Sequence, residues 1–162
     1  MIPNKFRGPT RAAASGFLAL GLGLTAAPMC IAAGFDSPED AVLALEQAYV
    51  QKNADLVVAS LDFIEEGRQL LQETNPALAN DPETIKQAAG LLEQSFRSEL
   101  RTKGFPDFSH LKCSFTGKAQ IAPELIKLAQ LCVSPDGARS AQDLIVKKRD
   151  TGWRVVLASP VF

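Results

Sequence analysis

The chain has 162 residues and a nearly balanced charge, with 17 lysines and arginines against 18 aspartates and glutamates. Lys5, Arg7 and Arg11 are the charged residues of the first 34 positions, so the remainder has a net charge of −4 and is not expected to attract nucleic acid. With one histidine and three cysteines, the sequence offers few of the side chains that commonly ligate transition metals. The sequence also contains no glycine-rich phosphate loop and no nucleophile elbow.

Residues 1–34 have the layout of a secretory signal peptide, with a basic start, an uncharged run and an end of small residues. A membrane anchor is the alternative, because the run reaches the roughly 20 residues needed to span a bilayer. The run is rich in alanine and glycine, however, which favours a signal peptide. A lipid anchor on Cys30 is disfavoured because Met29 stands where a small residue is required. We therefore predict export to the periplasm or the medium, of the Gram-negative type, and one mature domain over residues 35–162.

Three helices are expected in the first half of that domain. Ser37 followed by proline and two acids predicts a helix from Pro38 to about Lys52. A second apolar pattern starts after Asn53, and Gly67 is expected to break it in two. A third helix is predicted from residue 82, after an aspartate cap, to Lys103 and the terminating Gly104.

After residue 104 the apolar spacing changes from helical to strand-like. Strands over residues 110–119 and 125–134 are separated by turn residues, and further turns at 134–137 and 149–152 divide the rest into four strands in all. Helices followed by an antiparallel meander predict an α+β domain, with the helices packed on one face of the sheet. The basic segment 147–149 could bind an acidic partner, but we interpret it as a solvated hairpin tip.

Cys113 and Cys132 are equally far from the midpoint between Ala122 and Pro123. If the first hairpin turns at that midpoint, the two cysteines lie opposite one another, at a Cα separation that suits a disulfide. An even pair in an exported chain favours a disulfide, and paired free thiols are the alternative. A metal site would need further ligands, and His110 is expected to point to the opposite face of the strand.

Two short stretches resemble nuclear transport factor 2 (NTF2)-like domains, also called the cystatin-like or cone fold. Residues 37–62, SPEDAVLALEQAYVQKNADLVVASLD, are similar to the opening helices of these domains, and residues 146–156, VKKRDTGWRVV, are similar to their last hairpin. Residues 63–102 depart from the family pattern because they show no strand between the second and third helices. The resemblance implies that three N-terminal helices pack on a curved antiparallel sheet and enclose a conical pocket. Together with the signal-peptide pattern, it predicts an exported bacterial member of the superfamily.

Members of the superfamily use this pocket for catalysis, for ligand binding or for protein contacts, and the fold does not choose among these uses. In isomerase-like and cyclase-like members, a tyrosine of the first helix and strand acids, or a His-Asp pair, transfer protons. Tyr49 stands near the tyrosine position. The rest of the pattern is incomplete, because His110 has no evident aspartate partner and Asp143 is the only acid inside a predicted strand.

We therefore predict a non-enzymatic binding or interaction module that uses its pocket, with Tyr49 as a pocket residue, or its exposed sheet face. No catalytic residue, metal or cofactor is assigned. The expected partner is a small apolar ligand or a protein, with no nucleic acid, no stable membrane insertion after cleavage, and a homodimer through the sheet as a further expectation. A small isomerase-type or cyclase-type enzyme with Tyr49 in the pocket is the alternative.

Export predicts that the mature protein begins near Phe35. N-terminal sequencing of material isolated from the periplasm or the medium should start at residue 34 or 35, because the small residues before this point suit a signal peptidase. Recovery of Met1, or of a lipid on Cys30, would contradict the prediction.

Overall fold

The computed structural model describes residues 34–157, so the predicted signal peptide lies outside the described residues except for Gly34. The described part is α+β, as the sequence predicts, and its sheet is antiparallel with the strand order β1-β2-β3-β4. The helices are α1 (Pro38–Val50), α2 (Ala54–Ser60), α3 (Phe63–Thr74), the short 3-10 helix η1 (Pro76–Leu78) and α4 (Pro82–Lys103). The strands are β1 (Lys112–Ala122), β2 (Leu125–Val133), β3 (Arg139–Arg149) and β4 (Gly152–Val156).

Local sequence signals start and end α1 and α4 as predicted. The Ser37 side chain accepts a hydrogen bond from the Asp40 amide at 3.1 Å and caps α1. Asp81 caps α4 in the same way through the Thr84 amide, at 2.9 Å. Gly104 follows α4 with a φ of 84°, a backbone conformation that glycine adopts without strain.

The second helical segment is broken at Leu61 and Asp62, and the prediction of a break at Gly67 is wrong. Leu61 is extended and pairs with Val155 of β4 as an isolated parallel bridge, and the Asp62 amide donates to the Val155 carbonyl at 2.8 Å. This contact joins residues more than 90 positions apart, so no pattern of neighbouring residues in the sequence predicts it. Gly67 lies inside α3, where α4 crosses closely.

The first hairpin has the predicted cysteine register, but its turn lies elsewhere. Cys113 pairs with Cys132, while Ala122 pairs with Leu125, so the loop consists of residues 123–124. Two irregularities in β1, one after Phe115 and one after Gln120, each shift the pairing by one residue. Together the two irregularities shift the pairing by two residues, so the side chains on either side of them point to the same face of the sheet. The two shifts also offset the displaced turn, and Cys113 therefore still lies opposite Cys132 as predicted.

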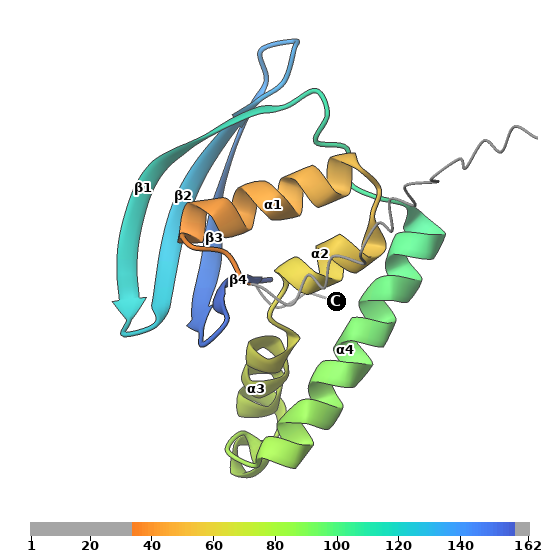
Figure 1. Cartoon of the computed structure of the whole chain (residues 1–162), viewed down its shortest axis with the longest axis vertical. Coiled ribbons are helices and arrows are strands. Elements are labelled where there is room, and N and C mark those ends of the chain that lie inside the picture. The colour runs from red at the N-terminus through yellow and green to blue at the C-terminus, as the bar shows by residue number, and fades with distance from the viewer. Residues whose placement is uncertain (1–33, 158–162) are drawn as a thin grey trace, which may run out of the picture.

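The concave face of the sheet is covered by α1, while α3 and α4 form an antiparallel pair that projects beyond the sheet (Figure 1). The core lies between α1 and the sheet, where Val42, Leu128 and Val146 are at most 1% exposed. The long helix α4 packs mainly against α3 and α2. Within residues 34–157, no helix combines the length and the apolar character that crossing a membrane requires.

The basic segment of the last hairpin is not simply solvated. Arg149 donates to both carboxylate oxygens of the buried Asp62, at 2.6 and 2.8 Å, and Lys147 lies 3.9 Å from Glu65. Asp62 also accepts the Glu65 amide at the start of α3. The hairpin is therefore tied to the beginning of α3 by charge, which corrects the interpretation of a free tip.

The α3–α4 crossing predicts opposite effects for two glycine-to-alanine substitutions. A Cβ at Gly67 would lie 2.9 Å from the Ala89 amide nitrogen, so Gly67→Ala should lower the free energy of unfolding by about 1–3 kcal/mol through overpacking. A Cβ at Gly90 meets nothing within 4 Å, so Gly90→Ala should raise it by up to about 1 kcal/mol through helix propensity. Urea unfolding of both variants measures the difference, and equal effects would contradict the packing described.

Candidate functional site

The candidate site surrounds Tyr49, near the C-terminal end of α1. Tyr49 is 8% exposed, and its ring stacks on Phe108, with ring centroids 5.5 Å apart and an interplanar angle of 15°. Phe108 belongs to the segment that leads from α4 to β1. Burial raises the pKa of Tyr49 to about 12, and the nearby Glu66 carboxylate adds to this increase, so the hydroxyl is neutral at physiological pH.

A surface pocket of about 350 Å³ lies beside the Tyr49 ring. Its apolar wall is supplied by α4 and the segment that follows it, and consists of Phe96, Leu100, Phe105 and Pro106. Two charged residues of α4, Glu99 and Lys103, also line the pocket, and their charged atoms lie 3.4 Å apart as an ion pair. The pocket is therefore an apolar hollow with one charge of each sign at its edge.

Glu66 is a buried carboxyl group that the sequence interpretation missed. Its side chain is in the first turn of α3 and accepts a hydrogen bond from the Leu157 amide at 3.0 Å. Burial raises the pKa of Glu66 to about 7, and the Asp62 carboxylate contributes in the same direction, while the Leu157 amide opposes the shift. Glu66 falls at helical spacing from Phe63 and Leu70, and this position on an apolar stripe is the signal that could have identified it.

Tyr49 and Glu66 interact electrostatically, but no hydrogen bond connects them. Within residues 34–157, no hydrogen bond is formed by the Tyr49 hydroxyl, although the Glu66 charge reaches it. His110 is exposed on the segment before β1, and Asp143 is exposed on β3, so neither completes an acid-base set at this tyrosine. Proton transfer needs a partner held against the reacting group.

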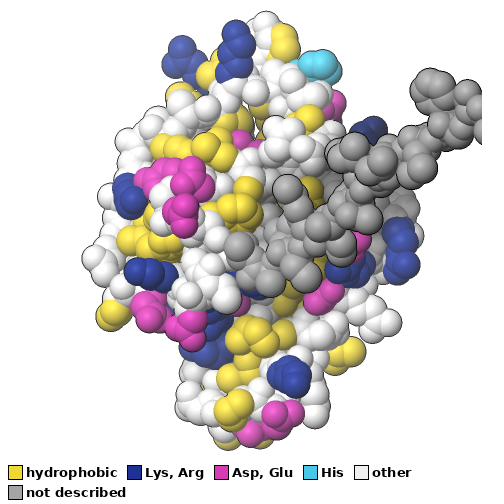
Figure 2. All heavy atoms as spheres, viewed as in Figure 1, with side chains coloured by type: hydrophobic (Ala, Val, Ile, Leu, Met, Phe, Trp, Pro, Cys, Tyr) yellow, Lys and Arg dark blue, Asp and Glu magenta, His cyan; other side chains and the backbone are white. Residues whose placement is uncertain are grey.

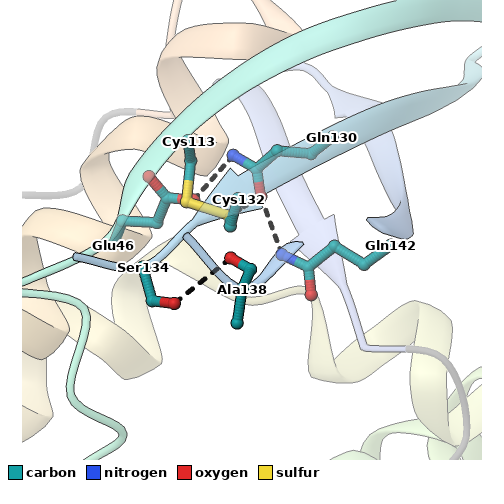
Figure 3. The surroundings of a disulfide bond; sticks show 7 residues. All are labelled: Glu46, Cys113, Gln130, Cys132, Ser134, Ala138 and Gln142. Carbon is teal, nitrogen blue, oxygen red and sulfur yellow. Dashed lines mark hydrogen bonds between the residues drawn. A yellow bond between two sulfur atoms is a disulfide. The ribbon is translucent and has the colours of Figure 1, made fainter. Parts of the chain in front are cut away.

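The two cysteines form a second candidate site, at a pocket that Phe108 also lines. Cys113 and Cys132 are joined by a disulfide between β1 and β2, with the Cα atoms 4.0 Å apart (Figure 3). The Glu46 carboxylate of α1 points toward the sulfur atoms, and one of its oxygens lies within 4.8 Å of both. Because both sulfurs are engaged in the disulfide, this group is not a set of thiolate metal ligands.

Two glutamines hold Glu46 in place. The Gln130 side chain is 1% exposed and donates to Glu46 Oε1 at 2.7 Å, and Gln142 donates to Gln130 Oε1, also at 2.7 Å. Burial raises the pKa of Glu46, although the hydrogen bond from Gln130 partly offsets the increase. A carboxyl group is thus oriented toward the disulfide by the buried Gln130 amide, which in turn is held by the exposed Gln142.

The charges on one face of the molecule are mixed in sign. Figure 2 shows acidic and basic side chains interspersed with apolar ones on the face that it presents. Charges of both signs on one face do not form the continuous basic surface typical of nucleic-acid binding.

Comparisons with known proteins find two solved structures of low sequence identity. No protein-family model matches the chain, and no curated protein matches it. A crystal structure from Campylobacter jejuni, described as a suspected NTF2-like transpeptidase, is 15% identical with a TM-score of 0.40 and covers 76% of this chain and 100% of its own. An NTF2-like protein of unknown function from Shewanella oneidensis MR-1 is 12% identical with a TM-score of 0.36 and covers 74% of this chain and 94% of its own.

Both solved structures are described as NTF2-like. Any statement about the function of this chain rests on the residues around Tyr49 and around the disulfide.

The buried Glu66 predicts a pH dependence of stability. Because its pKa rises from 4.5 in the unfolded chain to about 7 in the folded protein, the folded state binds the extra proton between these values, and stability falls as the pH rises through this window. Glu66→Gln removes this titration and can still accept the Leu157 amide. The variant should therefore gain stability relative to the wild type by roughly 3 kcal/mol between pH 4.5 and pH 8.

Urea unfolding of both proteins at several pH values measures this difference. The comparison isolates Glu66, because all other carboxyl groups are common to both proteins. A difference that does not change with pH would show that Glu66 is ionised and solvated in the folded state.

Proposed function

We propose that the protein is an exported, non-enzymatic binding module that holds a small apolar ligand in the pocket beside Tyr49. The observation that carries the proposal is an aromatic and aliphatic hollow of about 350 Å³ on the surface of the domain, next to a neutral tyrosine. This volume falls within the range of small-molecule sites, which are mostly apolar with few polar groups.

The lining indicates the kind of ligand. Phe96, Leu100 and Phe105 offer apolar contact to a flat or aliphatic body. Lys103 is exposed at the edge and can pair with an anionic group of the ligand by exchanging its contact with Glu99. An apolar molecule with one acidic group therefore fits the pocket best.

Export is part of the proposal and rests on two independent features. The first 34 residues have the pattern of a signal peptide, and the domain carries a disulfide between neighbouring strands. Disulfides persist in oxidising compartments such as the periplasm and are rare in the cytosol. A protein partner, or a second copy bound through the exposed sheet, is the alternative occupant of this module.

An isomerase-type or cyclase-type enzyme is the second candidate, and Glu66 favours it. A carboxyl group with a pKa of about 7 suits a general base at neutral pH, and its charge reaches Tyr49. Against this function, the pocket lining includes Tyr49 but not Glu66, and no described residue hydrogen-bonds to the Tyr49 hydroxyl. Binding therefore remains the better-supported function.

The binding function predicts that truncating a side chain of the pocket wall weakens the binding of an apolar anionic probe. The dye 1-anilinonaphthalene-8-sulfonate should bind the folded wild type with increased fluorescence. Phe105→Ala should weaken its binding by about 10-fold or more, because a buried aromatic contact is lost. Leu91→Ala is the control, since Leu91 is 68% exposed on α4 and does not line the pocket.

Equal affinity of the dye for both variants would contradict the assignment of this pocket. Tyr49→Phe separates binding from catalysis, because it keeps the ring stacked on Phe108 and removes only the hydroxyl. Probe binding within about 3-fold of the wild type and a retained biological role are expected. Loss of that role with unchanged stability and binding would favour the enzyme.

A further inference from the structure

A second surface pocket, of about 490 Å³, opens onto the disulfide. It lies between α1 and the beginning of β1, and Cys113 and Glu46 form part of its lining. Leu43 and Val50 of α1 provide exposed apolar surface at this pocket, with 48% and 41% of their surface accessible. Lys112 contributes a positive charge.

The two sulfur atoms are not equally accessible. Cys113 is partly exposed and lines the pocket, whereas Cys132 is 4% exposed and does not. A nucleophile that enters from solvent therefore meets Cys113 first, and Cys132 is the sulfur that would leave. Thiol–disulfide exchange depends on which sulfur can be reached and on how well the other leaves.

Glu46 is placed to exchange a proton with the leaving sulfur, that of Cys132. One carboxylate oxygen lies within 4.8 Å of both sulfurs, and Gln130 fixes the carboxylate from the buried side. The residues that face Glu46 from β1 are Lys112 and Cys113, which share its pocket, and those from β2 are Gln130 and Cys132. Lys112 is therefore the one fixed charge among these neighbours.

We propose that Cys113–Cys132 is a thiol–disulfide exchange site, at which an external thiolate attacks Cys113 and Glu46 carries the proton of Cys132. In the forward direction the thiolate forms a mixed disulfide with Cys113, and the bond between the two cysteines breaks. The electron pair of that bond stays on Cys132, whose thiolate takes a proton from the protonated Glu46. The products are the mixed disulfide, a Cys132 thiol and an ionised Glu46.

The reverse direction regenerates the disulfide with the same groups. Glu46 accepts the proton of the Cys132 thiol, and the Cys132 thiolate attacks Cys113 in the mixed disulfide. The external thiolate then leaves. The raised pKa of Glu46 assists both directions, because it brings the carboxyl closer to the pKa of a thiol.

The external reactant is a thiolate, carried either by a small molecule or by a cysteine of another protein. Lys112 favours a negatively charged reactant, and the apolar surface of Leu43 and Val50 can support a larger one. The pocket at the disulfide and the pocket beside Tyr49 share no lining residue. The exchange chemistry is therefore tested independently of the proposed ligand function.

The first test locates the attacked sulfur in the folded, oxidised protein. Reduced glutathione is added under native conditions, the reaction is quenched with acid, and the adduct is mapped by mass spectrometry. Glutathione should be found on Cys113 at least 10-fold more often than on Cys132. Reduced thioredoxin with its second cysteine replaced is the protein-thiol arm, and a faster reaction with it than with glutathione assigns the reactant to a protein thiol.

Adducts mainly on Cys132, or no reaction with either thiol until the protein is unfolded, would overturn the proposal and leave the disulfide as a structural bond. Cys132→Ala provides a second variant. Its Cys113 should form a stable mixed disulfide with oxidised glutathione in the folded protein.

The second test concerns the proton. Reduced protein is mixed with oxidised glutathione, and the closure of the mixed disulfide is followed from pH 6 to pH 10. Glu46→Gln keeps an acceptor for Gln130 and should slow closure about 10-fold at pH 7, with the rates converging above pH 9, where the Cys132 thiol ionises without help. Glu39→Gln, the same change on the same helix beside Lys118, should have no effect.

A Glu46→Gln rate equal to that of the wild type at pH 7 would overturn the role of Glu46. A rate reduced by the same factor at every pH would also overturn it, because that result indicates altered structure and not proton transfer.

Discussion

The ion pair between Asp62 and Arg149 is the contact on which the placement of the helices relative to the sheet depends. Asp62 is 3% exposed and receives two hydrogen bonds from the guanidinium group. The same residue begins α3 by accepting the Glu65 amide, and its own amide continues the backbone contact with Val155 of β4. A buried carboxylate without its cation carries a large desolvation cost, so the helix start and the hairpin stabilise each other.

The start of α3 then gives two adjacent glutamates opposite properties. Glu65 is buried, which opposes ionisation, but hydrogen bonds from Arg68 and Gln69 keep its pKa below the ordinary value. Glu66 is also buried, and within residues 34–157 its carboxylate accepts a hydrogen bond only from the Leu157 amide, so burial dominates and its pKa rises to about 7. The difference comes from the partners available on each side of the helix and not from the residue type.

The C-terminal half of α1 contributes side chains to both pockets. Tyr49 follows Glu46 by three residues, and the Phe108 segment packs against this part of the helix. Tyr49 lines the apolar pocket beside α4, and Glu46 reaches the disulfide under the start of β1. The helix α1 thus contributes a neutral aromatic side chain to one pocket and a carboxyl group beside the disulfide to the other.

The sequence by itself determined the features that arise between near neighbours in the chain. The caps at Ser37 and Asp81, the glycine after α4 and the strand alternation act within a few residues, so they predict α1, α4 and the meander correctly. Only the tertiary structure decided the break at Leu61 and the burial of Glu66. Both depend on β4 and the residue that follows it, about 90 positions away. The apolar stripe of α3 marks Glu66 as a candidate for burial, but no local signal marks its contact with Leu157 or the break at Leu61.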